Sequence, residues 1–205
     1  MIINQPFDEL FRTWSHIAIL RVLRDTVIGF SGNEAARLAG MDPKAAFRAL
    51  NSLETLGLVR RQRGGRDHIF NLNRSHYLIE QGVVPLFEVE ENFFKEVKTV
   101  IGKTLKPFVV SSIIFGSVAK RQETPLSDLD ICCIVKNNSQ KEKAIMALNN
   151  ISNKLYERFG LKLGPIFLTV SQFKEKASKR NTLITEILEY GKLVVGLQPR
   201  KLLHA

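Results

Sequence analysis

Apolar positions near the N-terminus recur with helical spacing in three successive segments. In the first segment, residues 15–27, they are Ile17, Leu20, Leu23 and Val27. The second, residues 33–40, follows Ser31, whose hydroxyl can cap the start of a helix. The third, residues 43–56, follows Asp42, which can cap in the same way. We therefore expect three short helices, one after another.

Strand-like runs follow the third segment. Residues 58–62 and 67–73 flank a Gly-Gly turn at 64–65, and their length and spacing predict a β-hairpin. The pattern then loosens for several residues. A long helix is expected from about Pro85 to Lys106, because Pro107 disfavours a continuing helix.

Beyond residue 107, β-branched runs alternate with helical segments. Strands are expected at residues 108–116, 129–136 and 164–170, and helices at residues 140–159 and from Ser171 and Thr182. This order predicts an α+β fold with a small mixed sheet and helices on one side of it. The expected organisation is an N-terminal domain over residues 1–80, a connecting helix over residues 81–106 and a C-terminal domain over residues 107–205.

The composition changes near residue 80. Before it, Lys44 is the one lysine among many arginines, whereas lysines predominate after it. The whole chain of 205 residues carries a formal net charge of +10. A charge of this size favours a polyanionic partner, because lysine and arginine contacts to phosphates release condensed counterions.

Several classes of protein are disfavoured by the sequence. Cys132 and Cys133 are adjacent in an apolar run and would point to opposite faces of a strand, so we expect packing residues and neither a disulfide nor a zinc site. The first residues lack the features of a signal peptide, and no apolar stretch has the length of a membrane span. We expect a cytoplasmic protein.

The order helix, helix, helix, hairpin resembles winged helix-turn-helix DNA-binding domains of the MarR and ArsR types, over roughly residues 12–75. The resemblance implies that the third helix enters the major groove of double-stranded DNA and that the protein acts as a homodimer spanning two half-sites. The expected DNA-binding residues are Lys44, Arg48 and Asn51 on the helix and Arg60, Arg61, Arg63 and Arg66 on the hairpin. The alternative is a dimerisation or scaffold module whose arginines form a solvated face.

The most informative motif lies between the first two C-terminal strands. Gly116 and Ser117 follow an apolar run, ten residues intervene, and Asp128-Leu129-Asp130 opens the next run. Strand alternation places the two carboxylates on one face, where they can share a divalent cation with phosphate oxygens. A glycine allows a sharp turn, and a serine hydroxyl with the amides of a helix start can donate to phosphates.

This motif resembles that of the minimal nucleotidyltransferases of the DNA polymerase beta superfamily, over about residues 90–196. The resemblance implies a nucleoside triphosphate, with ATP expected, bound through Mg²⁺ and transferred as a nucleoside monophosphate with release of pyrophosphate. Asp128 and Asp130 are the expected metal-binding and catalytic residues. Gly116, Ser117 and Lys120 are the expected nucleotide-binding residues.

Two departures from the family pattern bear on activity. Arg121 stands where the family usually has glycine. Active members usually carry a third carboxylate on the next strand, but no acidic residue lies between Phe159 and Ser171. A carboxylate from elsewhere would have to replace it, and the candidates are Glu123, Glu157 and Glu186.

Three functional hypotheses follow from these observations. The first is an Mg²⁺-dependent enzyme that transfers a nucleoside monophosphate to an unidentified acceptor and binds DNA through the winged helix. The second is a DNA-binding regulator whose transferase-like domain senses a nucleotide without chemistry, which the missing carboxylate favours. The third is an antitoxin that binds a toxin partner, as minimal nucleotidyltransferases commonly do.

Overall fold

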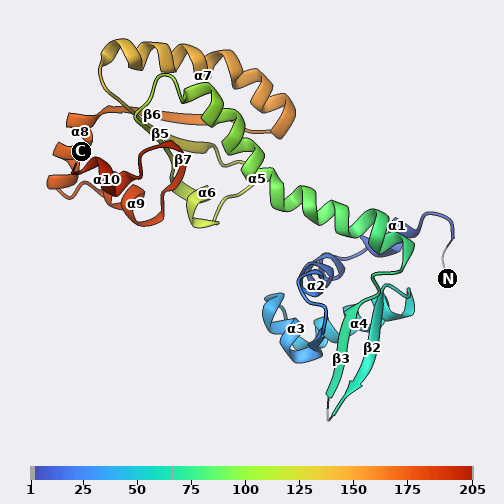
Figure 1. The fold of residues 1–205 in the computed structure, drawn as a ribbon. Coiled ribbons are helices and arrows are strands. Elements are labelled where there is room, and N and C mark those ends of the chain that lie inside the picture. The colour runs from blue at the N-terminus through green and yellow to red at the C-terminus, as the bar shows by residue number, and fades with distance from the viewer. Residues whose placement is uncertain (1–2, 66, 205) are drawn as a thin grey trace. The chain divides into compact units, whose positions relative to one another are not determined.

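The computed structural model describes residues 3–65 and 67–204 and is drawn in Figure 1. It forms two compact units, Met1–Asn92 and Phe93–Ala205. The elements of the first unit are α1 (Pro6–Leu10), α2 (Trp14–Arg24), β1 (Phe30–Ser31), α3 (Gly32–Leu38), α4 (Pro43–Thr55), β2 (Val59–Gly64), β3 (Asp67–Leu72) and the π-helix Ile79–Val83. Helix α5 (Val84–Leu105) contains the boundary between the units.

Local capping chemistry fixes the ends of α3 and α4. The Ser31 hydroxyl accepts from the Glu34 amide at 3.2 Å. The Asp42 carboxylate accepts from the amides of Lys44 and Ala45, so α4 begins where the sequence predicts. It ends before Gly57, which adopts a left-handed conformation at φ 77°.

The hairpin of β2 and β3 carries a third strand that the sequence did not predict. Strand β1 is only two residues long and pairs antiparallel with β3, which gives the sheet order β1-β3-β2. A strand this short has no alternation to detect. Val27, expected on the first helix, lies in the segment between α2 and β1 with its side chain 81% exposed, so that assignment was wrong.

The core of the first unit is aliphatic and lies between α2, α3, α4 and the hairpin. Its fully buried side chains include Leu10, Ile19, Leu20, Leu23, Leu50, Leu53 and Phe70. Phe87, from the first half of α5, is part of the same core. The start of α5 is therefore held by the first unit.

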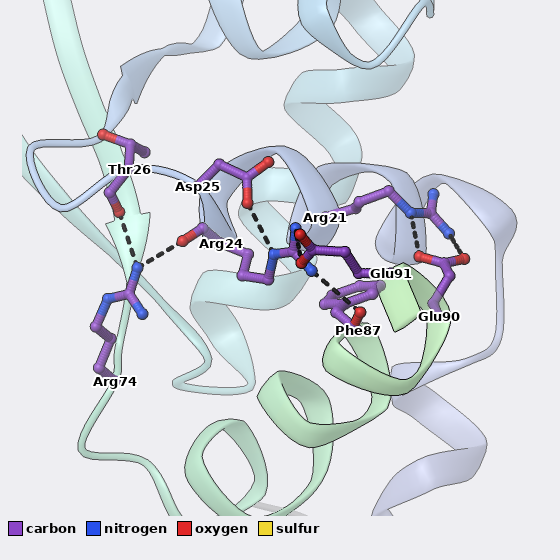
Figure 2. Close-up of polar contacts among 8 residues, drawn as sticks. All are labelled: Arg21, Arg24, Asp25, Thr26, Arg74, Phe87, Glu90 and Glu91. Carbon is purple, nitrogen blue, oxygen red and sulfur yellow. Dashed lines mark hydrogen bonds and ion pairs between the residues drawn. The ribbon is translucent and has the colours of Figure 1, made fainter. Parts of the chain in front are cut away.

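Polar contacts reinforce this attachment, as Figure 2 shows. Arg21 donates to both carboxylate oxygens of Glu90, at 2.8 and 2.7 Å. Arg24 donates to the Phe87 carbonyl at 3.1 Å and lies 3.5 Å from the Glu91 carboxylate. The bidentate hydrogen bond from Arg21 lowers the pKa of Glu90 below its ordinary value. Both partners are about half exposed, so the pair contributes less than about 1 kcal/mol to stability.

The second unit is built on a mixed sheet. Its further elements are β4 (Ser111–Ile114), α6 (Gly116–Lys120), β5 (Leu129–Val135), α7 (Asn138–Phe159), β6 (Leu163–Thr169), α8 (Val170–Ser178), α9 (Thr182–Tyr190), β7 (Lys192–Gly196) and α10 (Pro199–Leu202). The strand order is β6-β5-β4-β7. Strands β5 and β6 are parallel, and β4 runs antiparallel to both β5 and β7.

Helices pack on both faces of this sheet, which corrects the expectation of helices on one side. One face buries Ile131 and Cys133 against α5 and α7. The other buries Cys132 and Ile134 against α8, α9 and α10. Successive residues of β5 therefore alternate between two hydrophobic cores. Because both faces of the strand are buried, its sequence shows no polar face from which the helices on each side could be predicted.

One further strand was not predicted. Strand β7 pairs with β4 and completes the sheet at one edge, although its short run follows directly on α9.

Within residues 3–65 and 67–204, none of the helices combines the length and apolar character that a membrane crossing requires.

Candidate nucleotide-binding site

Gly116 forms the turn between β4 and α6. Its φ is 72°, a left-handed conformation that side chains disfavour. A β-carbon at this position would also collide with the carboxylate of Asp130. The position thus requires glycine for two independent reasons, and the turn lies directly against the acidic end of β5.

Asp130 and Asp128 lie at the start of β5. Asp130 is half-buried and Asp128, just before the strand, is exposed. Burial raises the pKa of Asp130 above its ordinary value, and the neighbouring negative charges of Asp128 and Glu186 raise it further. The site therefore holds negative charge that a cation would stabilise.

The next strand approaches this pair with a glycine. Asp130 is the register partner of Gly164 on β6. A β-carbon on Gly164 would lie 3.0 Å from Asp130 Oδ1 and 4.0 Å from the β-carbon of Asp128. At this register position β6 therefore offers no carboxylate beside Asp130.

Of the three acidic residues considered as replacements, Glu186 on α9 lies nearest the motif. Its Oε1 accepts a hydrogen bond from the Gly116 amide at 3.1 Å and lies 3.0 Å from Lys120 Nζ. Lys120 also lies over the Tyr190 ring, 5.6 Å from its centroid. Glu123 and Glu157 are exposed and form none of the ion pairs found among the described residues.

The acidic side chains of the site come from two elements. Asp128 and Asp130 lie at the start of β5, whereas Glu186 on α9 accepts from the Gly116 amide and pairs with Lys120. Within the described part of the chain, no group of three acidic, histidine or cysteine side chains is arranged to hold a metal ion. Any cation here would draw on the two aspartates and on oxygens of a ligand. Sequence reasoning missed Gly164, because a glycine signals nothing until its strand partner is known.

Ser117 follows the turn and is half-buried in the first turn of α6. Arg121 ends that helix with φ 58° and ψ 43°, a left-handed conformation. Its amide donates to the carbonyl of Val118 at 3.2 Å. The usual glycine of the family would adopt this conformation without strain.

This geometry gives a test of backbone strain. Replacing Arg121 by glycine should raise the free energy of unfolding by up to about 1 kcal/mol, because the left-handed conformation costs a side-chain-bearing residue roughly that much. Urea unfolding at neutral pH measures the change. Arg121→Ala is the matched control, since it removes the charge and keeps the strain. Equal stability of the two variants would contradict the backbone explanation.

The DNA-binding candidates of the first unit differ in their surroundings. Arg61 Nη2 lies 2.5 Å from Glu54 Oε2 and also donates to Asn51 Oδ1, while its guanidinium lies over the Phe70 ring. Arg61 and Asn51 are thus paired with each other and with α4. Arg60 donates to the Ser75 hydroxyl at 2.9 Å.

The remaining candidates are less constrained. Lys44 and Arg48 are exposed on α4, and Arg63 is exposed on β2. Within residues 3–65 and 67–204, none of the three side chains takes part in an ion pair. Arg66 lies outside the described residues. The side chains free to meet an external anion are therefore Lys44, Arg48 and Arg63.

Two solved structures give a distant match. One is described as a crystal structure of a mutant of the toxin-antitoxin MntA-HpeT, with 17% identity, a TM-score of 0.35, and coverage of 52% of this chain and 80% of that chain. The other is described as a crystal structure of the toxin-antitoxin with AMP-PNP, with 18% identity, a TM-score of 0.35, and coverage of 53% and 81%. Similarity at this level carries no inference about a ligand or partner of this chain.

A comparison with curated proteins finds no match. The family model described as polymerase beta, nucleotidyltransferase matches residues 96–199, just over half of the chain. The matched segment contains the Gly116 turn, both aspartates, Gly164 and Glu186. The chain therefore belongs to the polymerase beta nucleotidyltransferase family.

Proposed function

We propose that the second unit binds a nucleoside triphosphate, with ATP the expected nucleotide, and transfers its nucleoside monophosphate to an acceptor in an Mg²⁺-dependent reaction. The observation that carries the proposal is the contact between the Gly116 turn and the Asp130 carboxylate. It brings the donors of a phosphate-binding turn next to the ligands of a divalent cation. A triphosphate chelating Mg²⁺ needs both groups within a few ångströms of each other.

The residues present fit an Mg²⁺ ion that arrives with its nucleotide. Magnesium in proteins is commonly held by one or two carboxylates, with phosphate oxygens and water completing its six ligands. Asp128 and Asp130 supply two carboxylates at the start of β5. When bound, the ion would neutralise the negative charge that develops on the phosphates.

The protein's own groups would divide the remaining work. The amide of Gly116, the hydroxyl of Ser117 and the ammonium of Lys120 would bind and orient the terminal phosphates. The acceptor oxygen would then form a bond to the α-phosphorus while the bond to pyrophosphate breaks. The acceptor hydroxyl must lose its proton, and the β6 position that would carry a third carboxylate is Gly164. We therefore expect nucleotide binding together with slow transfer.

Calorimetry tests the nucleotide site. ATP, GTP, CTP and UTP titrated into the wild-type protein should show binding that requires Mg²⁺, and one base should be preferred. A variant with Asp128→Asn and Asp130→Asn should lose the Mg²⁺-dependent part, because an amide is a poor ligand for this hard cation. Unchanged binding by the double variant would contradict the assignment of the two aspartates, and absence of binding by both proteins would contradict the proposed function.

Glu186 has a specific consequence for this binding. Its carboxylate accepts from the Gly116 amide and lies beside Lys120, two of the donors assigned to the phosphates. A carboxylate and a phosphate carry the same charge and compete for the same hydrogen bonds. The triphosphate would therefore have to displace Glu186 from the turn before it could use them.

Removal of this competitor should strengthen binding. Glu186→Ala is expected to lower the dissociation constant for Mg²⁺-ATP by about tenfold, the equivalent of one charge-assisted hydrogen bond of roughly 1.4 kcal/mol. Glu157→Ala on α7, which removes an exposed carboxylate remote from the motif in sequence, is the matched control and should leave the constant unchanged. Weaker binding by Glu186→Ala would instead identify Glu186 as a replacement metal ligand.

We further propose that the first unit is a winged helix that binds double-stranded DNA as a homodimer. In support, α2, α3 and α4 precede an antiparallel hairpin, and Lys44, Arg48 and Arg63 are exposed and unpaired within the described residues. Helix α4 would enter the major groove and the hairpin would contact phosphates. Two half-sites would require two copies of the chain.

The pairing of Arg61 gives a discriminating test. The affinity for a labelled duplex should fall as salt rises, and Arg63→Gln should reduce the slope of log affinity against log salt by about one, because one phosphate contact is lost. Arg61→Gln should change the slope little, since Glu54 already neutralises that guanidinium. Fluorescence anisotropy measures both. An affinity for the duplex that does not change with salt would contradict the proposed phosphate contacts. Equal effects of Arg63→Gln and Arg61→Gln would contradict the different roles assigned to the two arginines.

A non-catalytic regulator is the second candidate function. The observation that favours it is Gly164, the residue beside Asp130 on β6 where a third carboxylate would be expected. In that case the Mg²⁺-nucleotide complex would act as a ligand that alters DNA binding.

A further inference from the structure

A cavity lies in the first unit, between the start of α2 and one face of α4. Its volume is about 540 Å³, and its lining is Arg12, Thr13, Ser15, His16, Ala45, Arg48, Ala49 and Ser52. A space of this size is within the range of small-ligand pockets. Neither nucleotidyl transfer nor the hairpin arginines account for it.

The lining is cationic and hydroxyl-rich. It contains the side chains of two arginines, one histidine and three hydroxyl residues, and no carboxylate. Arg12 pairs with Glu9 outside the lining at 3.3 Å, in an exposed contact that is weak in water. Arg48 takes part in no ion pair within the described residues. The electrostatic character of the cavity therefore favours an anion.

His16 is the buried polar group of the cavity. Its side chain is only 4% exposed, which is unusual for a histidine unless it is held in place. Its Nδ1 lies 3.1 Å from the carbonyl oxygens of both Glu9 and Leu10, so Nδ1 carries a hydrogen. Nε2 has no hydrogen-bond partner among residues 3–65 and 67–204. That nitrogen is available to a ligand in the cavity.

The start of α2 adds donors at the same place. Thr13 is the residue that precedes the helix, but its hydroxyl pairs with the Ser15 hydroxyl at 2.9 Å and caps no backbone amide. The His16 amide donates to the Thr13 carbonyl at 3.2 Å, so the amides left for an outside acceptor at the start of this 11-residue helix are those of Trp14 and Ser15. Ala45 and Ala49, one turn apart on α4, leave the space in front of them open.

From the unpaired Nε2 of His16, the arginines and the uncapped amides, we propose that this cavity is a binding pocket for a phosphate group. The ligand is a phosphate monoester or diester whose oxygens meet Arg48, Arg12 and the start of α2. His16 meets a hydroxyl or a protonated oxygen of the same ligand. Anionic oxygens suit this donor set because guanidinium groups bind phosphate in a bidentate manner.

Two sources supply such a phosphate: the backbone of DNA bound at α4, or a free nucleotide. The first source rests on the DNA binding proposed above, because Arg48 belongs to the helix assigned to the major groove. The second source is independent of it. Neither source of phosphate depends on nucleotidyl transfer by the second unit.

Trp14 provides a local reporter for the experiment. It is the single tryptophan of the chain, it is largely exposed, and it lies between two lining residues, Thr13 and Ser15. Inorganic phosphate is titrated into the full-length protein without divalent metal, at constant ionic strength maintained with chloride. We expect a saturable change in tryptophan fluorescence, and Arg48→Gln should weaken it by about tenfold.

Arg37→Gln is the matched control, because it removes an exposed arginine of the same unit that does not line the cavity and has no role in the proposed DNA contacts. Its titration should match the wild type. A fluorescence change without saturation, or an equal effect of the two substitutions, would overturn the pocket. All variants alter exposed side chains, so loss of the signal does not arise from loss of the core.

The source is then separated by competition. If a short DNA duplex displaces phosphate from the wild-type protein and Arg12→Gln weakens the duplex, the pocket holds a backbone phosphate. If AMP or ATP saturates the signal at lower concentration than phosphate and the duplex does not compete, the pocket holds a free nucleotide. Failure of the duplex to bind removes the first source and the DNA proposal together, while the phosphate titration still decides the pocket.

Discussion

The contact between Gly116 and the Asp130 carboxylate is the constraint on which the site of the second unit depends. Strands β4 and β5 pair antiparallel, and the Phe115 amide continues the ladder by donating to the Asp130 carbonyl at 3.1 Å. The next residue, Gly116, turns away from the sheet at a positive φ beside the Asp130 carboxylate. A side chain at this position would be strained by the backbone conformation and would collide with that carboxylate. Sheet register, turn conformation and placement of acidic groups are therefore one linked feature.

The charges collected by this turn are unbalanced. The negative charges of Asp128 and Glu186 both raise the pKa of Asp130. The neighbouring positive charge is Lys120, which lies within ion-pair distance of Glu186. Burial and like charge raise the pKa of Asp130, so its ionised form is costly until a cation arrives. In the proposed function, a bound divalent cation would relieve that cost, and a triphosphate would displace the Glu186 carboxylate that accepts from the Gly116 amide. The cation of the proposed ligand would thus supply the positive charge that the three neighbouring carboxylates lack.

Sequence reasoning located the features that depend on neighbours in the chain. The caps at Ser31 and Asp42 and the turn at Gly57 act within a few residues, so their outcome was visible from spacing alone. Strand β7 and the two-sided burial of β5 depend on contacts between distant segments, and the pairing of Arg61 with Glu54 depends on how β2 folds back on α4. Glu186 could be named only as one of three acidic candidates, because its approach to Gly116 is set by the packing of α9 across a sheet 70 positions away in sequence.

Gly164 on β6 is the residue that, in the proposed function, would separate nucleotide binding from transfer. The β-carbon of an acidic residue there would lie 3.0 Å from Asp130 Oδ1, and its carboxylate would add a negative charge near a group whose pKa is already raised. Such a charge is useful only where a second cation or a proton acceptor is needed for the chemical step. Glycine avoids the repulsion and leaves the two aspartates able to hold a nucleotide-bound ion. In the proposed function, this arrangement would favour retention of the Mg²⁺-nucleotide complex over rapid turnover, and displacement of Glu186 from the Gly116 amide would control whether the nucleotide enters.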